Sequence, residues 1–188
     1  MPKFYTHSSA IIDSNTSIGS DTKIWHFSHI SRDVKIGSNC TLGQNVFIGE
    51  KVIIGDNCKI QNNVSIFAGI LLEDDVFCGP SVVFTNVLRP RSRFPKNKNY
   101  EKTVISKGAT LGANSTIICP RKIGKYSFVG AGSVVTQDLP NFKLFYGNPA
   151  IDRGWVCKCG NSLNLITSNV RCLCGREYHL VSGELVQK

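Results

Sequence analysis

The sequence carries an aliphatic residue at every sixth position, and this period decides what the chain can fold into. Six residues are three alternations of a β-strand, so the side chains at this position all return to the same face. The period does not match the roughly 3.6-residue period of an α-helix, and we therefore predict short strands. The positions that obey it are Ile12, Ile18, Ile24, Ile30, Ile36, Leu42, Ile48, Ile54, Ile60, Ile66, Leu72, Cys78 and Phe84, then Ile105, Leu111, Ile117, Ile123, Val129 and Val135.

Two further columns of the repeat indicate how the strands are joined. Four residues after each aliphatic position the side chain is small or β-branched, which predicts a second inward column that only Arg121 breaks. Three residues after it, Asn, Asp or Gly is the usual residue, as at Asn15 and Asp21. These residue types tolerate positive φ, so each repeat is expected to end in a sharp corner. The pattern predicts an all-β coil of triangular cross-section, with three repeats to a turn and turns stacked as parallel sheet.

The charge of the chain is unevenly distributed. Its 188 residues allow one ordinary domain with a small appendage. Residues 1–9 are polar and no apolar run approaches the roughly 20 residues that cross a bilayer, so we expect a soluble cytoplasmic protein that does not span a membrane. Much of the formal net charge of +9 lies in residues 85–107, which hold one acid, Glu101, and seven bases, Arg89, Arg91, Arg93, Lys96, Lys98, Lys102 and Lys107. Such a segment attracts phosphates, and nucleic acid, an anionic membrane surface, a phosphorylated small molecule and a merely solvated loop all remain open.

Two interruptions of the repeat point to a site. The chain leaves the coil after Phe84 and returns near Ile105, and a long loop over residues 85–104 inside a solenoid is typical of a functional segment. Large aromatics, Trp25 and Phe27 among them, occupy outward columns of another repeat and favour contact with a neighbouring subunit. For His26 and His29 an interface hydrogen bond and a role in substrate binding or proton transfer are both open.

Four motifs together resemble a known family. They are Lys23–His26, Gln61–Ser65, Phe84–Asn86 followed by Pro90–Ser92, and Gly147–Ala150. In combination they are similar to the hexapeptide-repeat sugar N-acetyltransferases, above all to the UDP-2-acetamido-3-amino-2,3-dideoxyglucuronate N-acetyltransferases of O-antigen and lipopolysaccharide biosynthesis. The dTDP-3-amino-3,6-dideoxyhexose N-acetyltransferases are near relatives. The resemblance implies a left-handed parallel β-helix, a homotrimer with substrate between subunits, and acetyl transfer from acetyl-CoA to the 3-amino group of a nucleotide-linked sugar. Another UDP- or dTDP-amino sugar, such as a 4-amino sugar, is the alternative acceptor.

Acyl transfer to an amine needs a neutral nucleophile held close to the thioester carbonyl and donors for the developing oxyanion. By resemblance, Asn86 is expected to orient the amine, with His29 or His26 as the candidate base and the CoA sulfur as the other proton acceptor. Expected substrate contacts are Asn86, Arg89, Arg91, Arg93, Trp25 and Asn62. Expected acetyl-CoA contacts are Gly112, Ala113, Gly130, Ala131, Lys122, Lys125, Asn148, Pro149 and Arg153.

The repeat has ended by residue 152, so we predict a β-helix domain over residues 1–152 and a Cys-rich tail over residues 153–188. The tail holds two cysteine pairs, each followed by glycine, and resembles a zinc ribbon; the four cysteines are Cys157, Cys159, Cys172 and Cys174. One residue separates each pair where two are usual, so free thiols or a redox pair remain open, with His179 as a substitute ligand. Four other cysteines, Cys40, Cys58, Cys78 and Cys119, are expected to fill the core.

Three rival functions share parts of this pattern. A γ-carbonic-anhydrase-like enzyme needs three histidines around zinc, whereas two of the four here, His7 and His179, lie outside the repeats. A structural scaffold would not need the aromatic and basic insertions. A non-enzymatic nucleic-acid-binding module is the remaining alternative, although nucleic acid is not the partner that the motifs favour, and such binding would weaken steeply with salt.

Overall fold

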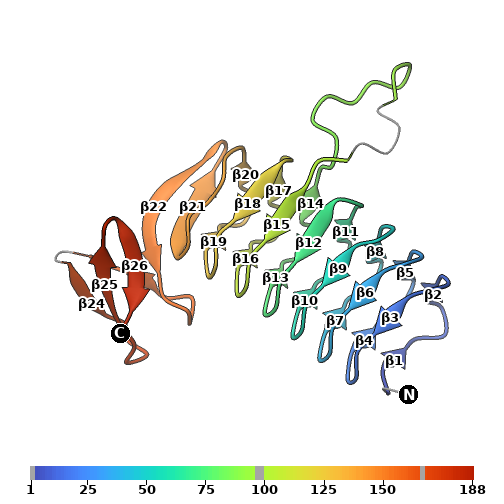
Figure 1. Cartoon of the computed structure of the whole chain (residues 1–188), viewed down its shortest axis with the longest axis horizontal. Coiled ribbons are helices and arrows are strands. Elements are labelled where there is room, and N and C mark those ends of the chain that lie inside the picture. Colours follow the sequence, from blue (N-terminus) through green and yellow to red (C-terminus); the bar gives the residue numbers. More distant parts are fainter. Residues whose placement is uncertain (1–2, 96–99, 166–167) are drawn as a thin grey trace.

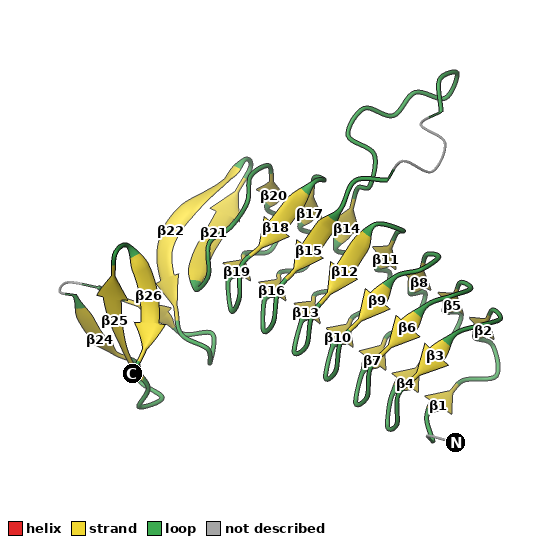
Figure 2. Ribbon diagram, in the orientation of Figure 1, coloured by secondary structure: helices red, strands yellow, loops and turns green. Residues whose placement is uncertain are grey.

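The computed structural model is a β-solenoid with one projecting loop and a small sheet at its C-terminal end (Figure 1). It describes residues 3–95, 100–165 and 168–188. None of these residues is helical, and the strands of the solenoid are mostly two residues long (Figure 2). No helix in the described part of the chain is long and apolar enough to cross a membrane.

Three parallel sheets form the faces of the solenoid, and we call them sheets I, II and III. Sheet I contains β1 (Tyr5–Thr6), β4 (Lys23–Ile24), β7 (Thr41–Leu42), β10 (Lys59–Ile60), β13 (Phe77–Cys78), β16 (Thr110–Leu111) and β19 (Phe128–Val129), and continues into β21 (Lys143–Gly147), β22 (Ala150–Val156) and β23 (Ser162–Leu163). Sheet II contains β2 (Ile11–Ile12), β5 (His29–Ile30), β8 (Phe47–Ile48), β11 (Ser65–Ile66), β14 (Val83–Phe84), β17 (Thr116–Ile117) and β20 (Val134–Val135). Sheet III contains β3 (Ser17–Ile18), β6 (Lys35–Ile36), β9 (Ile53–Ile54), β12 (Ile70–Leu72), β15 (Thr103–Ile105) and β18 (Arg121–Ile123).

Each turn of the solenoid takes one strand from each sheet, and we number these coils from the N-terminus, so that coil 1 begins with β1 and coil 5 with β13. Strands of one sheet are 18 residues apart, as Lys59 and Phe77 are. Two kinds of step differ. At the C-terminal end Phe128 pairs with Leu144, 16 residues on. Across the loop the partners are 33 residues apart, as are Phe77 and Thr110 in sheet I, Val83 and Thr116 in sheet II, and Leu72 and Ile105 in sheet III. The loop that causes this offset leaves after β14 and ends at residue 102, since β15 begins at Thr103.

The side chains of the two predicted inward columns do point into the solenoid. Every aliphatic repeat position from Ile18 to Val135 is buried, and so is nearly every member of the second column, from Thr22 to Ser133. The four cysteines expected in the core are buried too. Each enclosed Ile or Leu contributes about 1.5–3 kcal/mol, so a single continuous core runs the length of the coil.

The corners also follow the prediction. The Asn and Asp residues of the corner column have φ between 57° and 62°, from Asn15 to Asn114. Phe27 and Tyr126 adopt the same backbone conformation, with φ of 57° and 55°, although aromatic residues rarely do. The stacking of the coils therefore imposes the corner even where the residue type does not favour it.

The outward faces of the three sheets differ in charge. Sheet I presents Lys23 and Lys59, and sheet III presents Lys35 and Lys122. The outward residues of sheet II carry no Lys, Arg, Asp or Glu; they are Ile11, His29, Phe47, Ser65, Val83, Thr116 and Val134. Sheet II is therefore the face that a second copy of the chain would cover at the least electrostatic cost.

The C-terminal region begins as a continuation of sheet I. β21 and β22 form an antiparallel hairpin, and the division expected between residues 152 and 153 falls inside β22. A separate three-stranded sheet follows, made of β24 (Asn169–Arg171), β25 (Glu177–Val181) and β26 (Glu184–Gln187). It lies beyond the last coil (Figure 1). Its small core contains Cys157, Leu163, Cys172, Tyr178 and Leu185.

Candidate active site

A groove of about 650 Å³ runs along the edge where sheets II and III meet. Its walls come from the corners of coils 2 to 4 and from the foot of the loop. They include Ser31, Arg32 and Asp33 of coil 2, Phe47, Gly49, Glu50 and Lys51 of coil 3, Phe67, Ala68 and Gly69 of coil 4, and Asn86, Tyr100 and Lys102 of the loop. Successive coils are about 4.8 Å apart, so the groove is long enough for an extended ligand.

Asn86 lies at the upper end of this groove, where the chain leaves the coil. Its Nδ2 donates a hydrogen bond of 3.2 Å to the carbonyl oxygen of Ala68 in the coil below. Its own carbonyl oxygen accepts a hydrogen bond of 2.9 Å from the backbone N–H of Glu101, which closes the foot of the loop. The side chain is therefore held in a fixed orientation. Its Oδ1 accepts no hydrogen bond from any residue that the structure describes, and it remains available to an amine.

The wall of the groove combines aromatic and charged side chains. Phe47 and Phe67 pack with their ring centroids 6.0 Å apart. Arg32 pairs with Glu50 at 3.1 Å, and Lys102 adds a further positive charge at the other end. This lining gives a flat apolar surface beside a net positive rim, which is suited to a ring-bearing anionic ligand.

His29 stands on the outward face of sheet II and forms a pair with a carboxylate. Its Nε2 is 3.2 Å from Oδ2 of Asp13, and both side chains are partly exposed. The ring of His29 meets the edge of Phe47, with centroids 5.6 Å apart. His29 therefore borders the lower end of the groove without lining it. A carboxylate that holds an imidazole in this way can fix its tautomer.

The candidate catalytic residues do not meet within one chain. His26 and His29 belong to coil 2, whereas Asn86 leaves coil 5. Three coil spacings separate them by roughly 14 Å along the solenoid. The two histidines therefore cannot contact an amine that Asn86 holds in the same subunit.

A second group of candidates lies on a different edge, between sheets I and II. In coil 2 Trp25 is exposed, and His26 stacks on His7 with centroids 3.5 Å apart. Asn62 occupies the same edge two coils higher, where its Oδ1 accepts a hydrogen bond from the backbone N–H of Gln44.

The same edge carries four small residues in coils 6 and 7, which are Gly112, Ala113, Gly130 and Ala131. At Gly112 a Cβ would lie 2.4 Å from the backbone nitrogen of Ala131, so only glycine fits between these coils without a shift. The result is a strip of exposed backbone with no large side chain, which a narrow ligand can approach closely.

Five further acetyl-CoA candidates are scattered around the C-terminal coils. Lys122 projects from sheet III, and Lys125 lies at the corner between sheets III and I. Residues 148 and 149 form the turn of the β21–β22 hairpin, and the Arg153 guanidinium lies 4.8 Å from the ring of Tyr146. Lys122 and Lys125 are close to the small-residue strip in height but lie elsewhere around the coil. The hairpin turn lies on the same edge as the strip, because Phe145 pairs with Val129 directly before Gly130.

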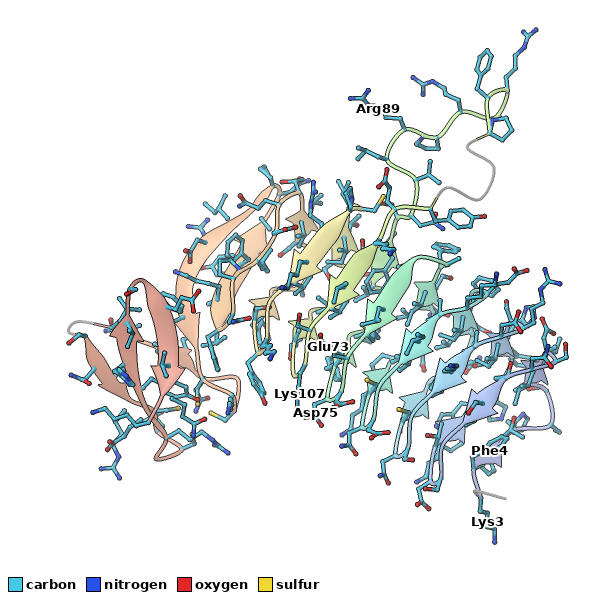
Figure 3. The ribbon with its side chains drawn as sticks, viewed as in Figure 1. Lys3, Phe4, Glu73, Asp75, Arg89 and Lys107 are labelled. Carbon is cyan, nitrogen blue, oxygen red and sulfur yellow. The ribbon has the colours of Figure 1, made fainter. Side chains whose placement is uncertain are left out.

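The three arginines of the basic segment lie on the projecting part of the loop. Arg89, Arg91 and Arg93 are exposed, and Arg89 lies on the projecting loop, clear of the body of the solenoid (Figure 3). They do not line the groove of their own chain. Leu88 and Phe94 on the same loop are also exposed. Lys96 and Lys98 lie outside the described residues.

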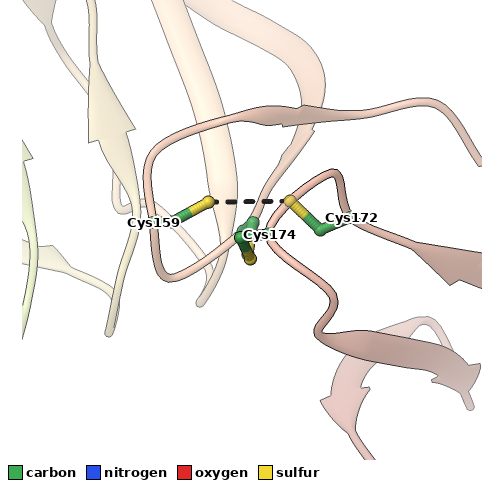
Figure 4. A group of neighbouring side chains, drawn as sticks. Cys159, Cys172 and Cys174 are labelled. Carbon is green, nitrogen blue, oxygen red and sulfur yellow. Dashed lines mark hydrogen bonds between the residues drawn. The ribbon is translucent and has the colours of Figure 1, made fainter.

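The four tail cysteines converge. Their sulfur atoms all lie within 4.8 Å of one another. Two chain segments supply them, and Figure 4 shows three of the four, Cys159, Cys172 and Cys174. The backbone N–H and the guanidinium of Arg176 lower the pKa of the Cys174 thiol to about 6. His179 is not a member of the group, and its Nδ1 is buried without a partner among the described atoms.

Sequence reasoning missed several residues of the groove. Phe47, Phe67 and Tyr100 line it, and Asp13 orients His29. A signal for two of them was present, because Phe47 and Phe67 are large aromatics at outward or corner positions of the repeat. Tyr100 gave no such signal, since it lies in the insertion where no repeat position applies.

The repeats themselves match a known family. The description "bacterial transferase hexapeptide (six repeats)" applies to residues 15–50 and 102–137, and "hexapeptide repeat of succinyl-transferase" to residues 33–68. Residues 15–68 and 102–137 are therefore similar to the hexapeptide repeats of bacterial transferases, and the expected fold, an all-β parallel β-helix of the hexapeptide-repeat type, is confirmed.

Among sequences, the chain is 44% identical over 90 residues to a dTDP-3-amino-3,6-dideoxy-alpha-D-galactopyranose 3-N-acetyltransferase of Aneurinibacillus thermoaerophilus. This match covers 48% of the chain and 47% of the relative, so the chain spans about half the length of that relative. It is also 43% identical over 65 residues to the bifunctional protein GlmU of Thermotoga maritima, over 34% of the chain and 14% of that protein.

Two solved structures share the fold. One is a hexapeptide transferase family protein from Anaplasma phagocytophilum, with a TM-score of 0.55, 18% identity, and coverage of 82% of this chain and 80% of the other. The second is a mutant of AntD, an N-acyltransferase from Bacillus cereus, in complex with dTDP and coenzyme A. Its TM-score is 0.51 at 20% identity, with 82% of both chains covered. At these identities the likeness concerns the fold alone.

Proposed function

We propose that this protein is an acetyl-CoA-dependent N-acetyltransferase that acts on the 3-amino group of a nucleotide-linked amino sugar, in the synthesis of a surface polysaccharide such as O-antigen. The observation that carries the proposal is the groove at the foot of the basic loop, with the immobilised Asn86 at its upper end. The 44% identity to a relative named as a sugar 3-N-acetyltransferase supports the choice of acceptor.

The working form that we propose is a homotrimer with sheet II facing the threefold axis. Sheet II has the outward face without formally charged residues, and the loop exposes Leu88 and Phe94, which a neighbour would cover. In such a trimer the edge between sheets I and II of one subunit meets the edge between sheets II and III of the next. The small-residue strip of one chain then lies beside the groove and loop of another.

A threefold axis parallel to the long axis of the solenoid leaves the position of every residue along that axis unchanged. Asn86 leaves coil 5, and Gly112 and Ala113 of the neighbour belong to coil 6, about 5 Å higher. The pantetheine arm of acetyl-CoA, lying along the strip, would bring its thioester to the level of Asn86. The basic loop, with Arg89 and Arg91, would face the phosphates of the nucleotide sugar.

The positions of Asn86 and of the thioester determine how the acetyl group is transferred. Asn86 Oδ1 accepts a hydrogen bond from the sugar amine and directs its lone pair at the thioester carbonyl. The nitrogen–carbon bond forms, the carbon–sulfur bond breaks, and backbone N–H groups of the strip stabilise the oxyanion. The amine proton goes to the departing thiolate of CoA, because His26 and His29 stay three coils away in either subunit. The His29–Asp13 pair belongs to the opposite end of the groove, where it would contact a distal part of the bound sugar nucleotide.

A cytoplasmic location fits this proposal. None of the eight cysteines is in a disulfide, including tail cysteines whose sulfurs lie 3.5 Å and 3.6 Å apart. Unpaired thiols at such distances are typical of a reducing compartment.

The proposed function is tested by an assay of the purified protein with acetyl-CoA and a panel of nucleotide sugars. The panel contains UDP- and dTDP-linked sugars with an amino group at C3 or at C4, and thiol release is followed. We expect turnover with 3-amino sugars and none with matched sugars that carry a hydroxyl at C3. Turnover with 4-amino sugars alone would contradict the acceptor, and no turnover with any member would contradict the function.

The arginines of the loop are expected to affect the Michaelis constant for the sugar. Replacing Arg89 or Arg91 with alanine removes a charge-assisted contact to phosphate worth about 1.5–3 kcal/mol, so KM for the nucleotide sugar should rise about tenfold or more at similar kcat. Steady-state kinetics with varied sugar concentration measures this. Arg171→Ala is the matched control, because Arg171 is exposed in the tail and far from the groove. Unaltered KM in both loop variants would remove these residues from the substrate site.

A further inference from the structure

The four tail cysteines form two copies of one local structure. In each, a cysteine, one residue, a second cysteine and a glycine make a tight turn between two strands. In the first copy the N–H of Gly160 donates to the carbonyl of Cys157, and in the second the N–H of Gly175 donates to the carbonyl of Cys172, at 2.8 Å and 2.9 Å. The two glycines have φ of 91° and 89°. The tail therefore contains two copies of the same turn, and the thiols of the first turn face the thiols of the second.

The distances between the sulfur atoms fit a tetrahedral metal and not a disulfide. Cys157 and Cys174 have their sulfurs 3.5 Å apart, and Cys159 and Cys172 have theirs 3.6 Å apart. Four thiolates about 2.3 Å from one Zn²⁺ are about 3.8 Å from each other. A disulfide requires about 2.05 Å. Donors also point at the sulfurs: the Tyr178 hydroxyl is 3.1 Å from Cys157, and the Arg176 guanidinium is 3.2 Å from Cys174. Such outer contacts are typical of metal-bound thiolates.

The cysteines connect two parts of the tail that share no strand pairing. The first turn joins β22 to β23, which belong to sheet I, and the second joins β24 to β25 of the terminal sheet. Among the described residues no backbone ladder links these two sheets. The core between them is small, with five buried residues of which two are cysteines. Modules below about 40 residues usually need a disulfide or a metal to fold.

The same module is attached to the last coils through aromatic rings. Tyr178, which contacts Cys157, meets the edge of Phe142 with centroids 5.8 Å apart. Phe142 in turn stacks on Tyr126 at 5.3 Å, and both occupy corners of the coil. Solenoids need a terminal element that covers the last repeat. The terminal sheet is placed to serve as that element.

From this geometry we propose that Cys157, Cys159, Cys172 and Cys174 bind one structural Zn²⁺, and that the zinc module is the C-terminal cap of the β-helix. Binding displaces the thiol protons to solvent and leaves all four positions of the metal filled by sulfur. The metal therefore holds structure and performs no chemistry on substrate. This proposal does not depend on the acetyltransferase activity.

The test uses the full-length protein. Metal analysis of protein purified without added zinc should find about one zinc per chain, and Co²⁺ exchanged into the site should give the visible bands of a tetrahedral tetrathiolate. The double variant Cys159→Ser, Cys174→Ser, which changes the two exposed ligands, should lose the zinc. Leu173→Ser is the matched control, because Leu173 lies between two ligands in the same turn and its side chain is 97% exposed. It should retain the zinc.

The capping role is measured by hydrogen exchange of the wild-type protein before and after removal of zinc with a chelator. We expect the amides of β21 to β26 to lose protection, those of coils 2 to 5 to keep it, and added zinc to restore it. A metal-free protein with a protected tail, bound iron in place of zinc, or disulfides between the four cysteines would each overturn the zinc site. Unchanged protection after zinc removal would overturn the cap.

Discussion

Replacing Asn86 with alanine is expected to lower kcat on the order of 10²-fold while the affinity for acetyl-CoA stays the same. The reason is positional: Asn86 Nδ2 is tied to the carbonyl of Ala68, so Oδ1 is fixed in the one place from which it can orient an incoming amine. Alanine keeps the coil but removes that acceptor. Steady-state kinetics with saturating acetyl-CoA gives kcat, and calorimetry gives the CoA affinity.

A control must separate loss of orientation from loss of the loop. Asn39→Gly is suitable, because Asn39 lies at the edge between sheets III and I, away from the groove. Its φ is 57°, a conformation that glycine tolerates. Its kcat should be unchanged. Hydrogen exchange at Glu101, whose N–H bonds to the carbonyl of residue 86, reports whether the foot of the loop stays closed in the alanine variant. A closed loop with full kcat would remove Asn86 from the catalytic site.

The sequence predicted the coil because burial repeats so regularly in it. A side chain such as Ile48 is enclosed by the corresponding residues of the coils above and below, so the period of the sequence is the period of the packing. The corners were equally predictable where Asn or Asp occupies them. At Phe27 and Tyr126 the residue type gave no indication, and the neighbouring coils determine the positive φ.

The site was harder to predict, because the role of a residue depends on which of the three edges of the solenoid it occupies. Asn86 was identified by the family resemblance and by its place where the coil meets the loop, and it does lie in the groove. The sequence did not indicate that Trp25, Asn62 and Gly112 share one edge while Asn86 lies on another. Sequence periodicity describes one coil, whereas the meeting of two edges depends on a second subunit. Height along the solenoid is what separates His29 from Asn86.

Substituting Val83 with glutamate is expected to prevent assembly and, with it, activity. Val83 is 49% exposed on the uncharged face of sheet II. In the proposed trimer three copies of this residue approach the threefold axis. Three carboxylates there would repel one another and lose hydration, so the trimer should dissociate. Because the groove and the small-residue strip come from different subunits, turnover should fall below detection.

Ile53→Glu is the matched control for this experiment. Ile53 is 45% exposed at an outward position of sheet III, so the two substitutions place the same charge on equally exposed aliphatic positions. Light scattering after size exclusion should give a trimer for the wild type and for Ile53→Glu, and a monomer for Val83→Glu. Circular dichroism of all three proteins should show the same β content, since Val83 faces outward and its loss leaves the core intact. If Val83→Glu remained an active trimer, sheet II could not face the axis, and the two edges would have to meet through another face.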